Sequence, residues 1–248
     1  MKNVILLSLF SLLYLLCGQK TQAQSNLTHF SVGYGTYQLN SYKNFQDNLV
    51  QNGIPFSGIK AVDMFPNYIN WMISQERIFN PNHAVAVEFS YLYTGGRNSL
   101  VDYSGRYTLD LLANSYRLGM SYTNYINDIS QNRMVIGFLR FRAGWTRSHF
   151  KMKEEIEIFN IHQQEMELSF FSDSFYLEFG PGLVYNINPF ISIHFSAGYE
   201  YEMDAKLKNF ENKNVTLSGP NHRYVTTNWS GFRLRAGIGI ELATLLNR

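Results

Sequence analysis

Residues 190–204 read Phe-Ile-Ser-Ile-His-Phe-Ser-Ala-Gly-Tyr-Glu-Tyr-Glu-Met-Asp, and this segment is the clearest indication of the fold. Apolar residues occupy every second position, and polar or small residues fill the positions between them. The apolar set is Ile191, Ile193, Phe195, Ala197, Tyr199, Tyr201 and Met203, and the other set is Ser192, His194, Ser196, Gly198, Glu200 and Glu202. A repeat of two is the period of a β-strand whose two faces differ. The segment therefore predicts a strand with one apolar and one polar face.

The same alternation occurs in seven further segments, and the connections between the eight segments differ in length. The other predicted strands are 28–40, 67–79, 83–95, 107–126, 133–150, 165–185 and 224–243. The odd-numbered connections are long, at 41–66, 96–106, 151–164 and 205–223, and the even-numbered ones are short and rich in turn formers. Short periplasmic turns and longer extracellular loops are typical of barrels in the outer membrane. We therefore expect an all-β fold, an eight-stranded antiparallel up-and-down transmembrane β-barrel with long extracellular loops and short periplasmic turns. A soluble β-sandwich is the alternative, but it gives no reason to segregate loops by length.

The N-terminus has the pattern of a cleaved secretory signal peptide. Lys2 precedes an apolar run from Val4 to Leu16, and the small residue Ala23 precedes Gln24. Thirteen residues are too few for a helix to cross a bilayer core of about 30 Å. We expect residues 1–23 to be the signal peptide, cleaved after Ala23, and residues 24–248 to be the barrel domain. Lipidation at Cys17 is the alternative, although Leu16 stands where a small residue is usual.

The composition of the mature chain excludes several classes of function. Removing Lys2 and Lys20 leaves 19 basic residues against 19 acidic ones, so charge gives no support for a nucleic-acid partner. Cys17 is the only cysteine, so the mature chain has no disulfide and no cysteine metal site. The sequence contains no phosphate-binding loop and no zinc signature. We expect no metal and no cofactor.

The cost of charge in lipid assigns the two faces of each strand. An Arg or Lys that faces lipid at the bilayer midplane costs about 2–4 kcal/mol, so the apolar face points outward and the charged face inward. The predicted inward network contains Glu76, Glu88, Arg117, Arg140, Arg142, Glu178, Glu200, Arg233, Arg235 and Glu241. Five acids and five bases inside a barrel of this size must pair, because isolated charges are too costly to bury. The pattern favours a charge-balanced plug over a selective pore.

These features together resemble the small eight-stranded barrels of the OmpA/OmpX kind, and more particularly the outer-membrane β-barrel proteins of Bacteroidetes. The resemblance covers residues 24–248, and it is one of pattern, with no motif that carries catalytic or ligand residues. It implies an outer-membrane protein whose partners are outer-membrane lipid, lipopolysaccharide and the outer-membrane assembly machinery, with an extracellular ligand at the long loops. One departure is the C-terminus, Leu245-Leu246-Asn247-Arg248, where many such proteins end on an aromatic residue.

The sequence is consistent with three functions. The first is a non-enzymatic barrel with a structural or surface-interaction role, and it is our first choice. The second is an enzyme acting on lipid A, because His194 and Ser196, with Glu200, resemble the His-x-Ser-Asn run of the PagL-type deacylases. Ala197 replaces that asparagine, and these side chains face the lumen, away from lipid. The third is a narrow channel or a conduit for a hydrophobic ligand.

The long segment 41–66 carries a second element. Residues 45–52 have the apolar spacing of a short helix, for which Asn44 is the expected cap. This helix is expected to fold over the barrel mouth, to dip into it or to lie on the membrane surface. The charged segment 151–157 in another long loop is expected to extend its flanking strands as a solvated hairpin.

Overall fold

The structure is a computed structural model that describes residues 26–49, 60–101, 103, 105–126, 134–158, 161–219 and 223–241. The predicted signal peptide, its cleavage after Ala23 and the C-terminal residues 242–248 lie outside these ranges.

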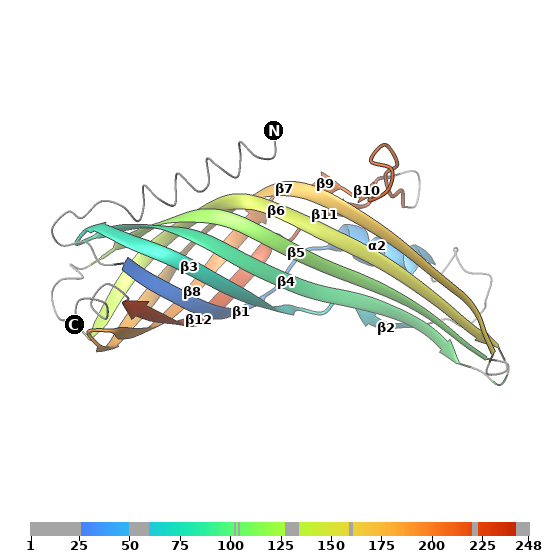
Figure 1. The fold of residues 1–248 in the computed structure, drawn as a ribbon, viewed down its shortest axis with the longest axis horizontal. Helices are drawn as coiled ribbons and strands as arrows, with labels where there is room; N and C mark the ends of the chain where they lie inside the picture. The colour runs from blue at the N-terminus through green and yellow to red at the C-terminus, as the bar shows by residue number, and fades with distance from the viewer. Residues whose placement is uncertain are drawn as a thin grey trace.

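Eight antiparallel strands form a closed ring (Figure 1). They are β1 (Asn26–Gly35), β3 (Tyr68–Asn80), β4 (His83–Val101), β5 (Gly105–Tyr125), β6 (Val135–Ile158), β7 (Ile161–Asn188), β8 (Ile191–Glu202) and β12 (Gly231–Glu241). Each strand pairs with the next one along the chain, and β1 pairs with β12 to close the ring. The prediction of an all-β, eight-stranded antiparallel barrel is confirmed.

The two faces of the strands are those that the alternation predicts. On β8, Phe195, Tyr199 and Tyr201 are exposed, whereas Glu200 and Glu202 are completely buried. Around the ring, the exposed apolar side chains include Phe30, Val32, Ile69, Trp71, Phe89, Phe141, Phe175, Phe179, Leu183, Phe232 and Leu234. We call this outer surface the apolar belt.

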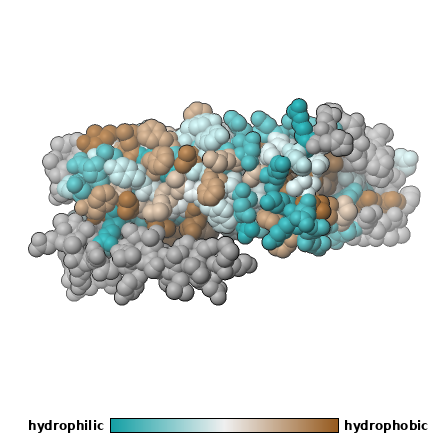
Figure 2. Space-filling model, turned by 90° about the horizontal axis from the view of Figure 1, so that it is seen from above, coloured by the Kyte–Doolittle hydropathy of each residue, from teal (hydrophilic) through white to brown (hydrophobic). Residues whose placement is uncertain are grey.

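Four strands continue far beyond the apolar belt. Crossing a membrane takes about 9–11 tilted residues, but β4, β5, β6 and β7 have 19, 21, 24 and 28 residues. In Figure 1 these strands run on together past the ends of β1, β8 and β12. Their continuation forms an open four-stranded sheet, which we call the extension. Figure 2 shows hydrophobic side chains gathered mainly over the barrel end and hydrophilic ones mainly over the extension.

The extension corrects the predicted loop 96–106, and it confirms that the charged segment 151–157 extends the flanking strands as a hairpin. Residues 96–101 and 105–106 belong to β4 and β5, and residues 151–158 and 161–164 belong to β6 and β7. The hydrogen-bonded ladder reaches Gly105, which pairs with Ile158. The apolar pattern weakens there because the outer face meets water and carries ion pairs. Lys151 lies 2.8 Å from Glu167, and Lys153 lies 2.6 Å from Glu155.

The first strand of the ring is shorter than predicted. β1 ends at Gly35, not at residue 40, and helix α2 (Asn40–Asn48) begins five residues before the predicted helix 45–52. Asn44 lies inside α2, and Leu39 precedes the helix without a side-chain cap. No helix in the described part of the chain is long and apolar enough to cross a membrane.

The last strand begins at Gly231, not at residue 224, because the preceding segment turns into the interior. Val225 is 2% exposed and Trp229 is completely buried. Short strands order this segment: β9 (Ala205–Lys206) pairs with β11 (Thr226–Thr227), and β10 (Lys208–Asn209) pairs with β7.

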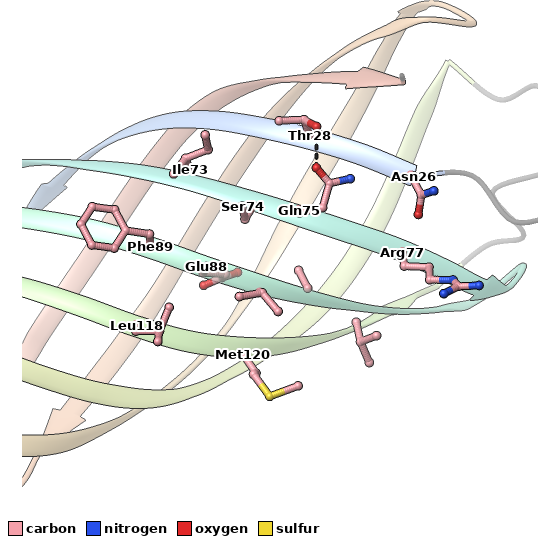
Figure 3. Close-up of a pocket in the computed structure, with 13 residues that line it drawn as sticks. Asn26, Thr28, Ile73, Ser74, Gln75, Arg77, Glu88, Phe89, Leu118 and Met120 are labelled. Carbon is pink, nitrogen blue, oxygen red and sulfur yellow. Dashed lines mark hydrogen bonds between the residues drawn. The ribbon is translucent and has the colours of Figure 1, made fainter. Parts of the chain in front are cut away.

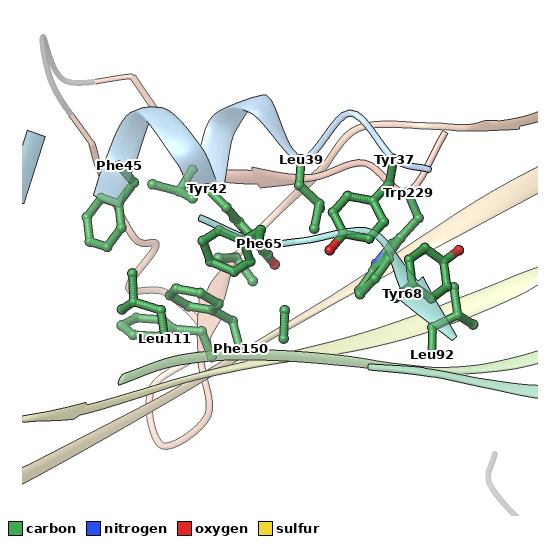
Figure 4. Close-up of a cluster of buried hydrophobic side chains, with 14 of the residues drawn as sticks. Tyr37, Leu39, Tyr42, Phe45, Phe65, Tyr68, Leu92, Leu111, Phe150 and Trp229 are labelled. Atoms are coloured by element: carbon green, nitrogen blue, oxygen red, sulfur yellow. The ribbon is translucent and has the colours of Figure 1, made fainter. Parts of the chain in front are cut away.

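A large apolar cluster fills the concave side of the extension, and we call it the cap. It joins α2 and its flanks to β2 (Lys60–Met64), to the segment 205–229 and to the inner face of β4–β7. Its buried members are Tyr37, Leu39, Tyr42, Phe45, Phe65, Tyr68, Leu92, Tyr107, Leu109, Leu111, Ala113, Phe150, Phe170, Leu207, Val225 and Trp229. Figure 4 shows α2 lying across this cluster, with Tyr42 and Phe45 pointing toward Phe150 on the sheet. The segment predicted as a loop therefore folds over the barrel mouth.

Candidate functional site

The interior of the barrel is built in three layers. Near the short turns lies a small apolar cluster of Ile78, Ala84, Tyr125, Ile136, Phe138 and Val184. The cap lies at the opposite end. Between them the inward positions of seven of the eight strands place a network of buried charges. This middle layer contains most of the residues that the sequence singles out.

The charge pair nearest the short turns joins Glu76 on β3 to Arg140 on β6. Arg140 Nη2 lies 2.8 Å from Glu76 Oε2, and Arg140 Nε donates to Thr123 Oγ1 at 2.8 Å. Glu76 also accepts a hydrogen bond from the Tyr125 hydroxyl, and His29 Nε2 lies 3.8 Å from its carboxylate. Glu76 is completely buried, so these contacts replace its hydration.

The central group connects two arginines through one carboxylate. Arg142 lies 3.0 Å from Glu88 and 2.5 Å from Glu178. Arg235 binds Glu178 with both terminal nitrogens, one of them at 2.7 Å from Oε2. A Cβ atom at Gly33 would lie 2.9 Å from Arg235 Cγ, so the glycine makes room for this side chain.

The upper group ties the network to the cap. Arg117 bridges Glu200 and Glu202, with one nitrogen at 2.6 Å from each carboxylate. Arg233 lies 2.8 Å from Glu200 and also donates to the backbone carbonyls of Thr36 and Trp229. The ends of β1 and β12 are thereby fixed to the charges beneath them.

The structure brings nine of the ten predicted network residues together, namely Glu76, Glu88, Arg117, Arg140, Arg142, Glu178, Glu200, Arg233 and Arg235. Glu241 departs from the expectation. It is the last residue of β12, half-buried beside Leu27, and no ion pair within the described residues joins it to the network. Glu202 is the fifth acidic residue of the network, although the network predicted from sequence did not include it. Its parity with Glu200 on one strand was the signal for it. With Glu202 included, five carboxylates neutralise five guanidinium groups.

The residues of the lipid A deacylase alternative do not form a triad. His194 Nε2 lies 2.7 Å from the Oγ of Ser192, which is four residues before the predicted Ser196. The rings of His194 and His29 meet edge to face at 4.3 Å. Glu200 is held by Arg117 and Arg233 and not by a histidine.

Beside these histidines lies a cavity of about 20 Å³, lined by His29, Ser31, His194, Ser196 and Arg235 among others. This is room for about one water molecule. Among the described residues, no group of three or more His, Cys, Asp or Glu side chains has the arrangement that a metal ion needs.

The chain matches no protein-family model, and no curated protein matches it. Its structure is similar to several solved outer-membrane proteins. Neisserial surface protein A is 13% identical, with 89% of this chain and 100% of that chain covered and a TM-score of 0.46. A major outer membrane protein from Thermus thermophilus is 11% identical, with 87% and 99% covered and a TM-score of 0.46. OprG from Pseudomonas aeruginosa is 12% identical, with 88% and 96% covered and a TM-score of 0.45. Eight antiparallel strands closed into a ring, with exposed apolar and buried charged side chains, form a β-barrel of the outer-membrane type.

Proposed function

We propose that the chain is an integral outer-membrane protein with a sealed lumen, which anchors the extension and the cap at the cell surface. The observation that carries this proposal is the three-layered interior. Within the described residues, a charge network lies between two apolar clusters and each of its arginines is bonded to a carboxylate, which supports a lumen closed to polar solutes. The balance of five charges of each sign supports a structural plug over an ion-selective pore.

The extension is the part of the molecule that fits a surface-interaction role. At about 2.5 Å of axial rise for each tilted residue, the 28 residues of β7 reach about 70 Å, against an apolar belt of about 25 Å. The outer face of the extension carries paired charges, including Arg97 with Asp110 and Arg147 with Asp173. The Asp110 carboxylate raises the pKa of Arg97 through a two-pronged hydrogen bond. A sheet that extends this far beyond the apolar belt is suited to contact with an extracellular ligand.

The same proposal names the partners of the chain. Outer-membrane lipid and lipopolysaccharide would surround the apolar belt, and the outer-membrane assembly machinery would insert it. Residues 1–23 would direct export and be removed after Ala23. The short turns would then face the periplasm, and the extension would face the outside.

Two measurements test this proposal. Purified protein in planar bilayers should conduct weakly or not at all. A cysteine at Asn212 should react with an impermeant reagent on whole cells, whereas a cysteine at Asn188 should react only after the outer membrane is opened. Steady open-channel currents from the wild type, or the reverse labelling pattern, would contradict the proposal.

The enzyme alternative has its own readout. Lipid A from cells that express the wild type, His194→Ala or Ser196→Ala should have the same acylation. A change that disappears in both variants would favour the deacylase instead.

A further inference from the structure

Two grooves hollow the outer face of β3, β4 and β5. Figure 3 shows the one near the short turns, which Phe89, Leu118 and Met120 make largely apolar, as a surface that meets acyl chains should be. The other lies at the long-loop end, where the extension begins, and has a volume of about 740 Å³. Aromatic rings beside polar groups are typical of a ligand site. We call it the junction groove, and its lining includes Asp63, Asn67, Trp71, Tyr93, Arg97 and Asp110.

A break in strand pairing creates the junction groove. The ladder of β2 on β4 ends at Gly96, and the ladder of β3 on β4 begins at Leu92. Residues 65–69 therefore lie opposite residues 93–95, five against three, and the longer segment cannot follow the strand. Gly95 stands at the centre of the break, on the outward parity of β4, and has no side chain to fill it. A hollow between the two ladders follows.

The wall of the groove at this break is held in place by the protein itself. Phe65 is buried with φ at 46°, a conformation that bulky side chains seldom adopt. The Thr94 hydroxyl donates to the backbone carbonyl of Pro66 at 3.0 Å. The amide nitrogen of Asn67 donates to the Tyr34 hydroxyl at 2.7 Å. This bond sets the plane of the Asn67 amide, whose oxygen accepts no hydrogen bond within the described residues and is left for a ligand.

The side of the groove nearest the apolar belt is a platform of aromatic rings. Trp71 is 60% exposed and Tyr93 is 48% exposed. Tyr91 pairs with Trp71 across the two strands, and its ring centre lies 5.1 Å from that of Tyr116 on β5. The face of an aromatic ring is electron-rich and attracts groups with a weak positive charge. The C–H groups on one face of a sugar ring are of this kind, so the platform is suited to stacking against a sugar.

The opposite side of the groove is a row of charged side chains on the extension. Asp63 on β2, Arg97 on β4 and Asp110 on β5 are direct partners in the register. Arg97 binds both oxygens of Asp110, at 2.5 Å and 2.8 Å. Two acids and one base in the described lining give a formal charge of −1, which disfavours an anionic ligand. The row offers donors and acceptors side by side, which suits hydroxyl groups, because each of them both donates and accepts.

We propose that the junction groove binds an uncharged saccharide. One sugar ring stacks on Trp71 and Tyr93, and its hydroxyl groups bond to the amide oxygen of Asn67 and to the charged row. Tyr93 and Arg97 are four residues apart, about 13 Å at about 3.3 Å per residue, so a short chain of sugars reaches both sides. The inference rests on the proposed function, because it needs the long-loop end to face outside. Two sources of such sugars meet there, the lipopolysaccharide of the outer leaflet and an extracellular glycan.

The test is binding of the full-length protein in detergent to an array of immobilised oligosaccharides. The neutral arm carries gluco-, galacto- and manno-tetrasaccharides, and the membrane arm carries the dephosphorylated core oligosaccharide of lipopolysaccharide from the expressing cells. Sulfated tetrasaccharides form the anionic arm. We expect binding in the neutral or the membrane arm and none in the anionic arm. Preference for the core oligosaccharide would assign the site to lipopolysaccharide, and preference for a neutral tetrasaccharide would assign it to an extracellular glycan.

Variants then place the binding in the junction groove. Tyr93→Ala should weaken binding of the preferred oligosaccharide about tenfold, as removal of an aromatic anchor does at other interfaces. Tyr93→Phe should bind like the wild type, because the ring and not the hydroxyl makes the contact. Asn67→Leu should weaken binding as well, because it removes the acceptor. The matched control is Tyr201→Ala, which removes an exposed tyrosine of β8 on the opposite side of the ring and should leave binding unchanged.

Every variant is first shown to fractionate with the outer membrane and to migrate as a closed barrel. Binding in neither the neutral nor the membrane arm, or equal binding by Tyr93→Ala and the wild type, would overturn the saccharide site alone. Binding confined to the anionic arm would also overturn it. Recovery of the wild type as a soluble protein would overturn the proposed function, and the saccharide site with it.

Discussion

Replacing Arg140 by Met tests whether the buried charges act as pairs. Arg140 Nη2 lies 2.8 Å from Glu76, and no other arginine contacts that carboxylate among the described residues. Methionine keeps an apolar stem of similar volume but removes the cation. Glu76 is completely buried, so its carboxylate would keep only the Tyr125 hydroxyl, a 3.4 Å hydrogen bond from the Thr123 hydroxyl and the neighbouring His29.

Leaving one partner of a buried pair uncompensated typically costs about 3–5 kcal/mol. The three remaining contacts of Glu76 place our expectation near the lower end, at about 3 kcal/mol. This is roughly a hundredfold change in the unfolding equilibrium, since about 1.36 kcal/mol corresponds to a factor of ten.

The matched control is the double variant Arg140→Met/Glu76→Gln, in which the orphaned charge is also removed. It should recover most of the lost stability. Urea unfolding in lipid vesicles, followed by tryptophan fluorescence and by the heat-modified shift on gels, measures both variants. An Arg140→Met barrel as stable as the wild type would refute the pairing argument. A double variant as unstable as the single one would also refute it.

Three further outcomes follow from the structure. Arg235→Ala and Arg233→Ala should both destabilise the barrel. Arg233→Ala should also raise the conductance in planar bilayers, because of these two arginines Arg233 is the one that donates to the backbone carbonyls of Thr36 and Trp229 beside the cap. Trp229→Ala should lower the free energy of unfolding by about 3–5 kcal/mol, as for other buried tryptophans. The change should be visible as faster proteolysis of segment 205–229, whereas cleavage at the wild-type rate would contradict a packed cap. Burial and the nearby Arg147 lower the pKa of His149, so the extension should lose stability as the pH falls below about 6.5. Hydrogen exchange at pH 7.5 and pH 5 should show this loss in the wild type and not in His149→Gln. An equal loss in both proteins would exclude His149 as the cause.

The ring could be predicted because each membrane-crossing strand has one face against lipid and the other against buried polar groups. Lipid outside and buried charges inside force a strict alternation, as Phe195 and Glu200 illustrate on β8. The same parity identified Arg117 and Arg142 as inward residues. It did not identify which acid each would meet, because partners such as Arg117 and Glu200 are 83 residues apart in sequence.

The charged sequence of 151–157 predicted a hairpin there, but the β4–β5 part of the extension and the cap could not be predicted, because neither has one face against lipid and the other against buried charges. Beyond Arg147 the outer face of β6 meets water, so its alternation no longer marks a membrane boundary. The inner face is buried by residues such as Tyr42 and Trp229, which come from distant segments and not from the strands themselves. The helix was placed too late because its anchor, Leu39, precedes the apolar spacing and is completely buried. Glu241 was misassigned because the parity of β12 says nothing of where the network ends.

The cap draws its side chains from both ends of the barrel sequence. Tyr37, Leu39 and Tyr42 follow β1, whereas Leu207, Val225 and Trp229 precede β12. The backbone N–H of Thr226 donates to Ser41 Oγ at 3.0 Å, across 185 residues of chain. During insertion these two groups cannot meet until the first and last strands are adjacent. Closure of the ring and covering of its mouth are therefore coupled, and a chain that stops before β12 would leave the apolar inner face of the extension partly uncovered.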